Sequence, residues 1–165
     1  MKMIKLGLAT LLMAGALLGE EATAPVTSSK GYLDIGLGPC PVPLPNFGIG
    51  YRGQQNHNGF DFSLNAATVV HATQIKGAAL YQYFFKPNLK SQFYVGGGPA
   101  LSYAFTSKGH VWLLAPEVVF GKQYQNEAGD TRFMQVSVEW PTFALERHHT
   151  IVKFPLVYFT YGIMF

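Results

Sequence analysis

The 165-residue chain is poor in cysteine, in charge and in long apolar runs. Its single cysteine cannot form a disulfide scaffold or a cysteine-rich zinc site. Charged residues make up only 13% of the chain and aromatic residues 15%, a composition that excludes a disordered protein. Past Lys30 no stretch reaches the roughly 18 consecutive apolar residues of a membrane-spanning helix. What remains is a folded chain of one domain, since a domain typically takes about 100 to 200 residues.

The N-terminus predicts a secretory signal peptide. Lys2 and Lys5 precede an apolar run over 6–18 that is too short for a membrane anchor. We expect 1–19 to be the signal, with the cleaved bond at about 16–22.

Residues 20–30 are expected to form a flexible leader, and 31–165 the folded domain. Loss of 1–19 removes two lysines and turns 12 basic against 9 acidic residues into 10 against 9. The remaining Lys and Arg are scattered singly, without the basic stripe of a nucleic-acid-binding protein. Nucleic acid is therefore excluded as a partner.

Apolar residues alternate with small or polar residues through the rest of the chain, which predicts strands with two different faces. Eight such segments can be distinguished, at 31–38, 47–52, 60–66, 73–85, 93–105, 112–123, 134–140 and 157–165. Most links are short and rich in turn residues, so consecutive strands should be antiparallel. The proline-rich 39–45 and the longest link, 141–153, are expected to be loops.

The two faces differ in a way that favours a membrane barrel. A soluble barrel fills its interior with apolar side chains. Here one face carries bulky apolar groups along every segment, and the other carries mainly Gly, Ala, Ser, Thr, Asn and Gln. Because the interior of an eight-stranded barrel has just enough room for side chains, the small face fits inside and the bulky face fits lipid. Aromatic residues near segment ends predict interfacial girdles: Tyr32, Tyr51, Tyr83, Phe85, Phe93, Phe105, Trp112, Trp140 and Phe165.

The last segment carries a more specific pattern: Val157, Phe159, Tyr161, Ile163 and Phe165 alternate up to the terminal carboxylate. In this the chain resembles the small outer-membrane β-barrel proteins of Gram-negative-type bacteria. In that family a final strand ending in Phe acts as the recognition signal for the barrel-assembly machinery. The resemblance implies an outer-membrane location, contact with the lipid bilayer and lipopolysaccharide, and both termini on the periplasmic side.

Charged residues within the segments are expected to point into the barrel, because a basic side chain on the lipid face costs about 2 to 4 kcal/mol near the midplane. Six charged residues occupy positions of the small, inward face. We expect Asp34, Arg52 and Asp61 to form one cluster near the periplasmic ends, and Lys76, Glu117 and Glu139 to lie further along the barrel. Buried charges persist only when they are paired. We therefore interpret both clusters as an interior plug rather than as catalytic groups.

An enzymatic alternative rests on His148 and His149, which lie in the longest link beside Glu146 and Arg147. The related barrels include lipid A acylases and deacylases that use His, Ser and an acid near the outer rim. No serine stands next to either histidine, so the sequence assigns no catalytic residue, no cofactor and no metal site. Cys40 is expected to be an unreactive loop residue.

The predicted fold is thus all-β, an eight-stranded antiparallel up-and-down transmembrane barrel, and the predicted protein is a monomer. Its expected role is structural or surface-exposed, without an open pore. Two alternatives stay open: a lipid A-modifying enzyme acting at the outer rim, and a secreted soluble β-barrel that binds a small hydrophobic ligand.

Overall fold

The computed structural model describes residues 27–40, 44–69, 72–87, 89–106, 109–140, 143–144 and 155–165. The predicted signal peptide lies outside this part of the chain. The described residues contain no helix of the length and apolarity that a membrane crossing requires.

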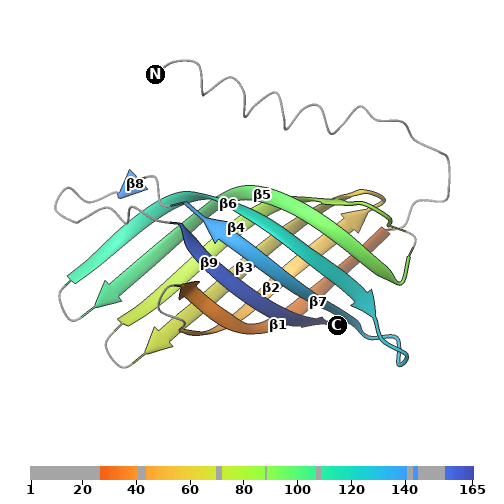
Figure 1. Ribbon diagram of the computed structural model, residues 1–165, viewed down its shortest axis with the longest axis horizontal. Helices are drawn as coiled ribbons and strands as arrows, with labels where there is room; N and C mark the ends of the chain where they lie inside the picture. Colours follow the sequence, from red (N-terminus) through yellow and green to blue (C-terminus); the bar gives the residue numbers. More distant parts are fainter. Residues whose placement is uncertain are drawn as a thin grey trace, which may run out of the picture.

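Eight long strands form one closed antiparallel sheet (Figure 1). They are β1 (Thr27–Cys40), β2 (Pro45–Gln55), β3 (Asn58–Val69), β4 (Ala72–Phe84), β5 (Ser91–Thr106), β6 (Gly109–Gln125), β7 (Thr131–Glu139) and β9 (Leu156–Met164). Consecutive strands pair, β9 pairs with both β1 and β7, and the β5–β6 pairing completes the ring. Each long strand therefore has two neighbours and no backbone edge is left open. The predicted fold class is confirmed.

The two-residue strand β8 (Phe143–Ala144) continues the line of β7 along β6. The β6–β7 ladder ends at the pair of Glu117 with Glu139, and Phe143 then pairs with Leu114. Between these ladders the Trp140 N–H donates to the Pro116 carbonyl at 3.1 Å. β8 therefore extends one wall of the barrel and adds no ninth strand to the ring.

β1 begins earlier than expected, at Thr27, so the last four residues of the expected leader belong to the barrel. They stay in the ladder because β2 is long enough to pair with them, from Thr27 opposite Gln55 to Lys30 opposite Arg52. Because these four side chains are polar, no apolar alternation marks this part of the strand in the sequence.

The expected loop 39–45 is also shorter in the structure. Pro39 and Cys40 lie in β1 and Pro45 opens β2. Pro39 is tolerated because the β1–β9 register shifts between Leu37 and Cys40, where a missing N–H breaks no ladder hydrogen bond.

The barrel has two distinct ends. One end, called the turn end here, carries Thr27, Phe165 and the turns between β2 and β3, between β4 and β5, and between β6 and β7. The opposite end, called the loop end, carries the remaining links. In Figure 1 the turn end lies on the right, where the C-terminus is marked.

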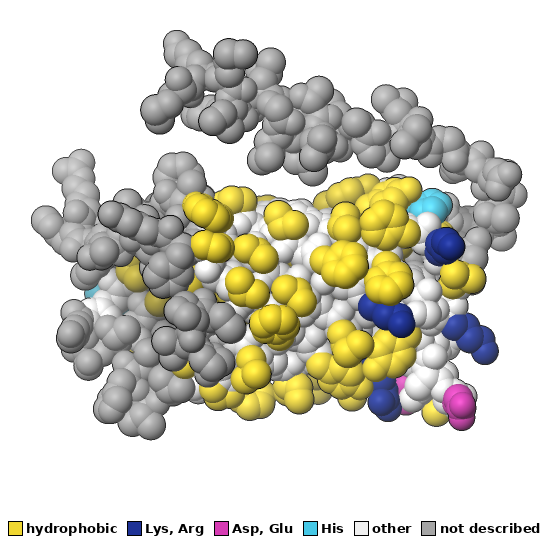
Figure 2. Space-filling model, in the orientation of Figure 1, with side chains coloured by type: hydrophobic (Ala, Val, Ile, Leu, Met, Phe, Trp, Pro, Cys, Tyr) yellow, Lys and Arg dark blue, Asp and Glu magenta, His cyan; other side chains and the backbone are white. Residues whose placement is uncertain are grey.

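The bulky apolar side chains point outward, as Figure 2 shows for the visible side of the barrel. Among the most exposed are Leu33, Ile35, Phe47, Ile49, Phe60, Phe62, Val118, Phe120 and Phe159, each at least half exposed. A soluble barrel would hold such side chains in its core. The outward position of these side chains argues against the alternative of a secreted ligand-binding barrel.

Aromatic side chains lie outward near both ends. Tyr51, Phe85 and Phe93 are exposed toward the turn end, and Phe105 and Trp112 toward the loop end. The girdle prediction is wrong for Tyr32, which is only 2% exposed and points inward. Because alternate residues of a strand share a face, Tyr32 lies on the inward face with Asp34 and not on the outward face with Leu33.

The interior holds more bulk than the sequence suggested. Besides small and polar groups it contains buried rings, namely Tyr32, Phe84, Tyr94, Phe133 and Tyr158. Eight strands enclose a space that side chains must fill, and small residues alone would leave it empty.

Inward glycines make room for three of these rings. Tyr32 lies opposite Gly50, Tyr94 opposite Gly121, and Phe133 opposite Gly162 on the neighbouring strand. A Cβ on any of these glycines would approach a ring carbon to 2.2 or 2.3 Å, closer than atoms can pack. Each ring therefore lies over its cross-strand glycine, and the two residue types are needed together.

Candidate functional site

The first group of interior charges, the arginine layer, is centred on Arg52 near the turn end. Arg52 on β2 lies directly opposite Asp61 on β3, and its Nε is 2.6 Å from Asp61 Oδ2. The Tyr32 hydroxyl donates to Asp61 Oδ1 at 2.8 Å, and Arg52 Nη2 donates to Gln135 Oε1 at 3.1 Å. Arg52, Asp61 and Tyr32 are all buried, so this ion pair is shielded from solvent.

Aromatic rings surround the guanidinium. Arg52 Cζ lies 4.4 Å from the ring centroid of Phe133, 4.7 Å from that of Tyr94 and 5.6 Å from that of Tyr32. These are the three rings that lie over glycines, so the glycines also position the surroundings of the cation. A desolvated cation–π contact stabilises by about 2 kcal/mol. The Tyr94 hydroxyl closes the layer by donating to Gln135 Oε1 at 2.9 Å.

The second group of interior charges, the glutamate layer, lies closer to the loop end. Lys76 Nζ donates to Glu117 Oε1 at 2.9 Å, and Glu117 lies opposite Glu139 on β7. Glu139 accepts hydrogen bonds from Ser102 Oγ and the Tyr158 hydroxyl, both at 3.1 Å. Lys76 Nζ also lies 3.9 Å from the ring centroid of Tyr158. The structure thus brings Lys76, Glu117 and Glu139 together.

Asp34 does not join Arg52 and Asp61 as predicted, and no hydrogen bond or ion pair links it to them among the described residues. On β1 the residue paired with Arg52 is Lys30, and Asp34 lies four residues further from the turn end. Register places it in one row with Gly48, Asn65 and Lys76 instead. Its Oδ1 is buried without a hydrogen-bond partner in the described part of the chain.

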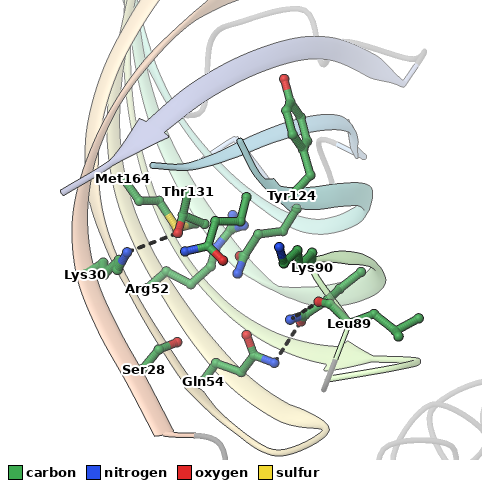
Figure 3. Close-up of a pocket in the computed structure, with 12 residues that line it drawn as sticks. Ser28, Lys30, Arg52, Gln54, Leu89, Lys90, Tyr124, Thr131 and Met164 are labelled. Atoms are coloured by element: carbon green, nitrogen blue, oxygen red, sulfur yellow. Dashed lines mark hydrogen bonds between the residues drawn. The ribbon is translucent and has the colours of Figure 1, made fainter. Parts of the chain in front are cut away.

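A polar cavity of about 290 Å³ lies at the turn end (Figure 3). Lys30, Arg52 and Lys90 line it together with the amides of Gln54, Gln92, Gln123 and Gln125. Lys30 Nζ donates to Thr131 Oγ1 at 3.0 Å, and Gln54 Nε2 donates to Gln92 Oε1 at 3.0 Å. No carboxylate side chain is among the described residues that line it, so the cavity is a small basic vestibule.

The residues of the enzymatic alternative, His148 and His149, lie outside the described residues. His57, in the turn between β2 and β3, places Nδ1 2.6 Å from the Phe84 carbonyl oxygen. Within the described ranges no group of three or more His, Cys, Asp or Glu could hold a metal ion.

The predicted assembly signal forms one outward row along β9 and the residue that follows it. Phe159, Ile163 and Phe165 are 50%, 45% and 74% exposed, with Val157 and Tyr161 half-buried on the same face. The Phe165 N–H donates to the Gly31 carbonyl at 3.0 Å, which attaches the terminal residue to β1.

Solved structures similar to this chain include two barrels. Neisserial surface protein A (NspA) aligns with a TM-score of 0.60 and 11% identity over 84% of this chain and 97% of that one. The N-terminal β-barrel domain of Pseudomonas aeruginosa OprF aligns with a TM-score of 0.59 and 14% identity over 85% of this chain and all of that domain. Both are bacterial outer-membrane β-barrels. The chain shares their fold.

No family model matches the sequence, and no curated protein matches it. At 11% and 14% identity the likeness extends to the barrel architecture and not to individual site residues.

Proposed function

We propose that this protein is a monomeric bacterial outer-membrane barrel with a closed interior and a structural or surface-exposed role in the cell envelope. The outward belt of bulky apolar side chains carries the proposal. Transfer of apolar surface out of water stabilises by about 25 cal/mol per Å². A contiguous belt around a whole barrel is therefore unfavourable in water and favourable in a bilayer.

The strand count constrains the orientation. With an even number of strands, the start of β1 and the end of β9 lie at the same end, the turn end, which we assign to the periplasm. The loop end then faces the medium, and β7 ends and β9 begins there, the two consecutive long strands with the greatest separation in sequence. Short periplasmic turns and longer external loops are the usual arrangement in such barrels.

The interior layers support a closed barrel. The arginine layer combines a buried ion pair with three rings, and the glutamate layer adds a second buried ion pair. An eight-stranded barrel has little interior space beyond its own side chains. These layers act as a plug, and the role that we propose is non-catalytic and needs no cofactor.

Assembly would use the outward row on β9. β9 pairs with β1 and so completes the ring. Recognition of Val157, Phe159, Tyr161, Ile163 and Phe165 by the barrel-assembly machinery would present the last strand for closure. Lipid acyl chains and lipopolysaccharide are the other partners that the exposed belt fits.

The test is fractionation of expressing cells, followed by extraction with and without detergent. We expect the protein in the outer-membrane fraction, soluble only with detergent, and migrating differently in SDS gels before and after boiling. Planar bilayers with purified protein should show no stable conductance. Recovery of folded protein in the aqueous fraction without detergent would refute the proposal.

A further inference from the structure

An apolar groove of about 780 Å³ lies on the outside of the barrel. Side chains from β2, β1, β9, β7, β6 and β5 line it, including Phe47, Ile35, Phe159, Val136 and Phe120. Its lining is almost entirely apolar, with one cation, Lys122.

Register gives the groove a direction. One row of paired residues crosses all six strands, in the order Phe93, Lys122, Met134, Tyr161, Ile35 and Phe47. Phe93 lies two residues from the turn-end start of β5, whereas Phe47 lies two residues from the loop-end start of β2. Because the strands are tilted, the row runs obliquely from the turn end toward the loop end.

Two basic side chains, Lys122 and Arg132, lie at the turn end of this groove. We call this pair the basic rim. Lys122 lies opposite Met134 and Arg132 lies opposite Tyr124, so the two are diagonal neighbours on the outward face of β6 and β7. Diagonal neighbours are roughly 7 to 8 Å apart, which long side chains can span. Figure 2 shows Lys and Arg side chains beside the hydrophobic belt toward this end.

The contacts of the basic rim hold it beside the groove. Lys122 Nζ lies 5.4 Å from the ring centroid of Phe93, and Arg132 Nη1 lies 3.3 Å from the Tyr161 hydroxyl. Phe93 and Tyr161 both line the groove. Asp130 Oδ2 lies 4.0 Å from Arg132 Nη2 in a solvent-exposed pair, and such pairs are weak. The rim therefore keeps net positive charge where the apolar groove begins.

We propose that this surface binds an anionic glycerophospholipid of the periplasmic leaflet, with its phosphate at the basic rim and an acyl chain in the groove. The inference rests on the proposed function, which assigns the turn end to the periplasm. The lipid's own geometry matches the site, because one anionic group is followed by a long apolar chain that extends toward the membrane centre. Lipid A phosphates belong to the other leaflet and lie beyond reach of this rim.

The test measures lipid selectivity with the full chain reconstituted in phosphatidylcholine vesicles. Spin-labelled phosphatidylglycerol and spin-labelled phosphatidylcholine are added in separate samples, and electron spin resonance gives the fraction of each that the protein immobilises. We expect the wild type to favour phosphatidylglycerol. The Lys122→Gln/Arg132→Gln variant should lose that preference, by about fivefold for each basic side chain removed.

The matched control is Lys86→Gln/Lys90→Gln, which removes the same charge from the turn end at two residues that do not line the groove. It should keep the preference of the wild type. Equal selectivity of the rim variant and the control would overturn the proposal, as would displacement of phosphatidylglycerol by an equal amount of lipid A.

Heat-modifiable migration in SDS gels, recorded for every sample, distinguishes failure of the proposed function from failure of the lipid site. If the wild type does not insert into the vesicles, the proposed function fails. If all variants insert and fold but none prefers the anionic lipid, only the lipid site fails.

Discussion

Replacement of Arg52 by methionine tests whether the arginine layer holds the barrel together. Arg52→Met keeps an unbranched side chain among the rings of Tyr94 and Phe133 but removes the cation. Asp61 then stays buried, with Tyr32 donating at 2.8 Å and Gln82 only at 3.4 Å.

The expected loss is large because the pair is 2.6 Å long and both side chains are 2% exposed. Removal of one partner of a buried ion pair destabilises by about 3 to 5 kcal/mol, since the other charge is left uncompensated. Replacement of both charges by apolar groups is often nearly neutral. The double variant Arg52→Met/Asp61→Leu should therefore regain much of the free energy that Arg52→Met loses.

The assay is urea unfolding of the reconstituted protein, followed by the fraction that keeps the folded mobility in unboiled SDS gels. Arg132→Met is the control, because it breaks only weak contacts, the exposed 4.0 Å contact with Asp130 and a 3.3 Å hydrogen bond to the Tyr161 hydroxyl, and should cost about 1 kcal/mol. The reasoning is refuted if Arg52→Met costs no more than this control, or if the double variant is less stable than Arg52→Met.

Three further predictions concern packing, closure and assembly. Gly121→Ala should destabilise by about 1 to 3 kcal/mol in the same assay, because its Cβ would come within 2.3 Å of the Tyr94 ring; Gly53→Ala, with nothing within 4 Å, should be neutral. Glu117→Ala leaves Lys76 without its 2.9 Å partner, so it should lower the thermal stability of the barrel and raise its conductance in planar bilayers; unchanged stability would argue against the plug. Phe165→Ala should reduce the amount of barrel assembled in cells while the refolded protein keeps its unfolding free energy within about 1 kcal/mol, since a 74% exposed ring packs little; equal loss in both measurements would make the residue structural.

Much of the architecture was predictable because alternation is a local property. Each strand repeats its faces every two residues, so the number of strands, their antiparallel order and the outward position of Phe47, Phe62 or Phe159 could be inferred segment by segment. The residues at which strands begin and end were harder to predict. Thr27 to Lys30 belong to β1 although no apolar alternation marks them, because pairing with β2 extends beyond the apolar belt.

The sequence predicts which charged residues point into the barrel, but not which of them contact one another. Parity correctly placed all six charges on the inward face, where each is buried. The expected contact of Asp34 with Arg52 is absent because the β1–β2 register aligns Lys30 with Arg52. The buried rings could have been found from the sequence, since Tyr32 and Tyr94 alternate in step with the inward glycines of their own strands, and Phe133 with the inward Gln135 and Ser137.

The amino-acid sequence by itself determined which residues face inward and which face outward, because that choice needs only the two-residue repeat of a strand. The tertiary structure alone decided which partners meet: Arg52 with Asp61, Tyr94 with Gly121, and Lys122 with the outer groove. Those contacts depend on register between strands and on the stagger with which the ring closes, and no single strand encodes either.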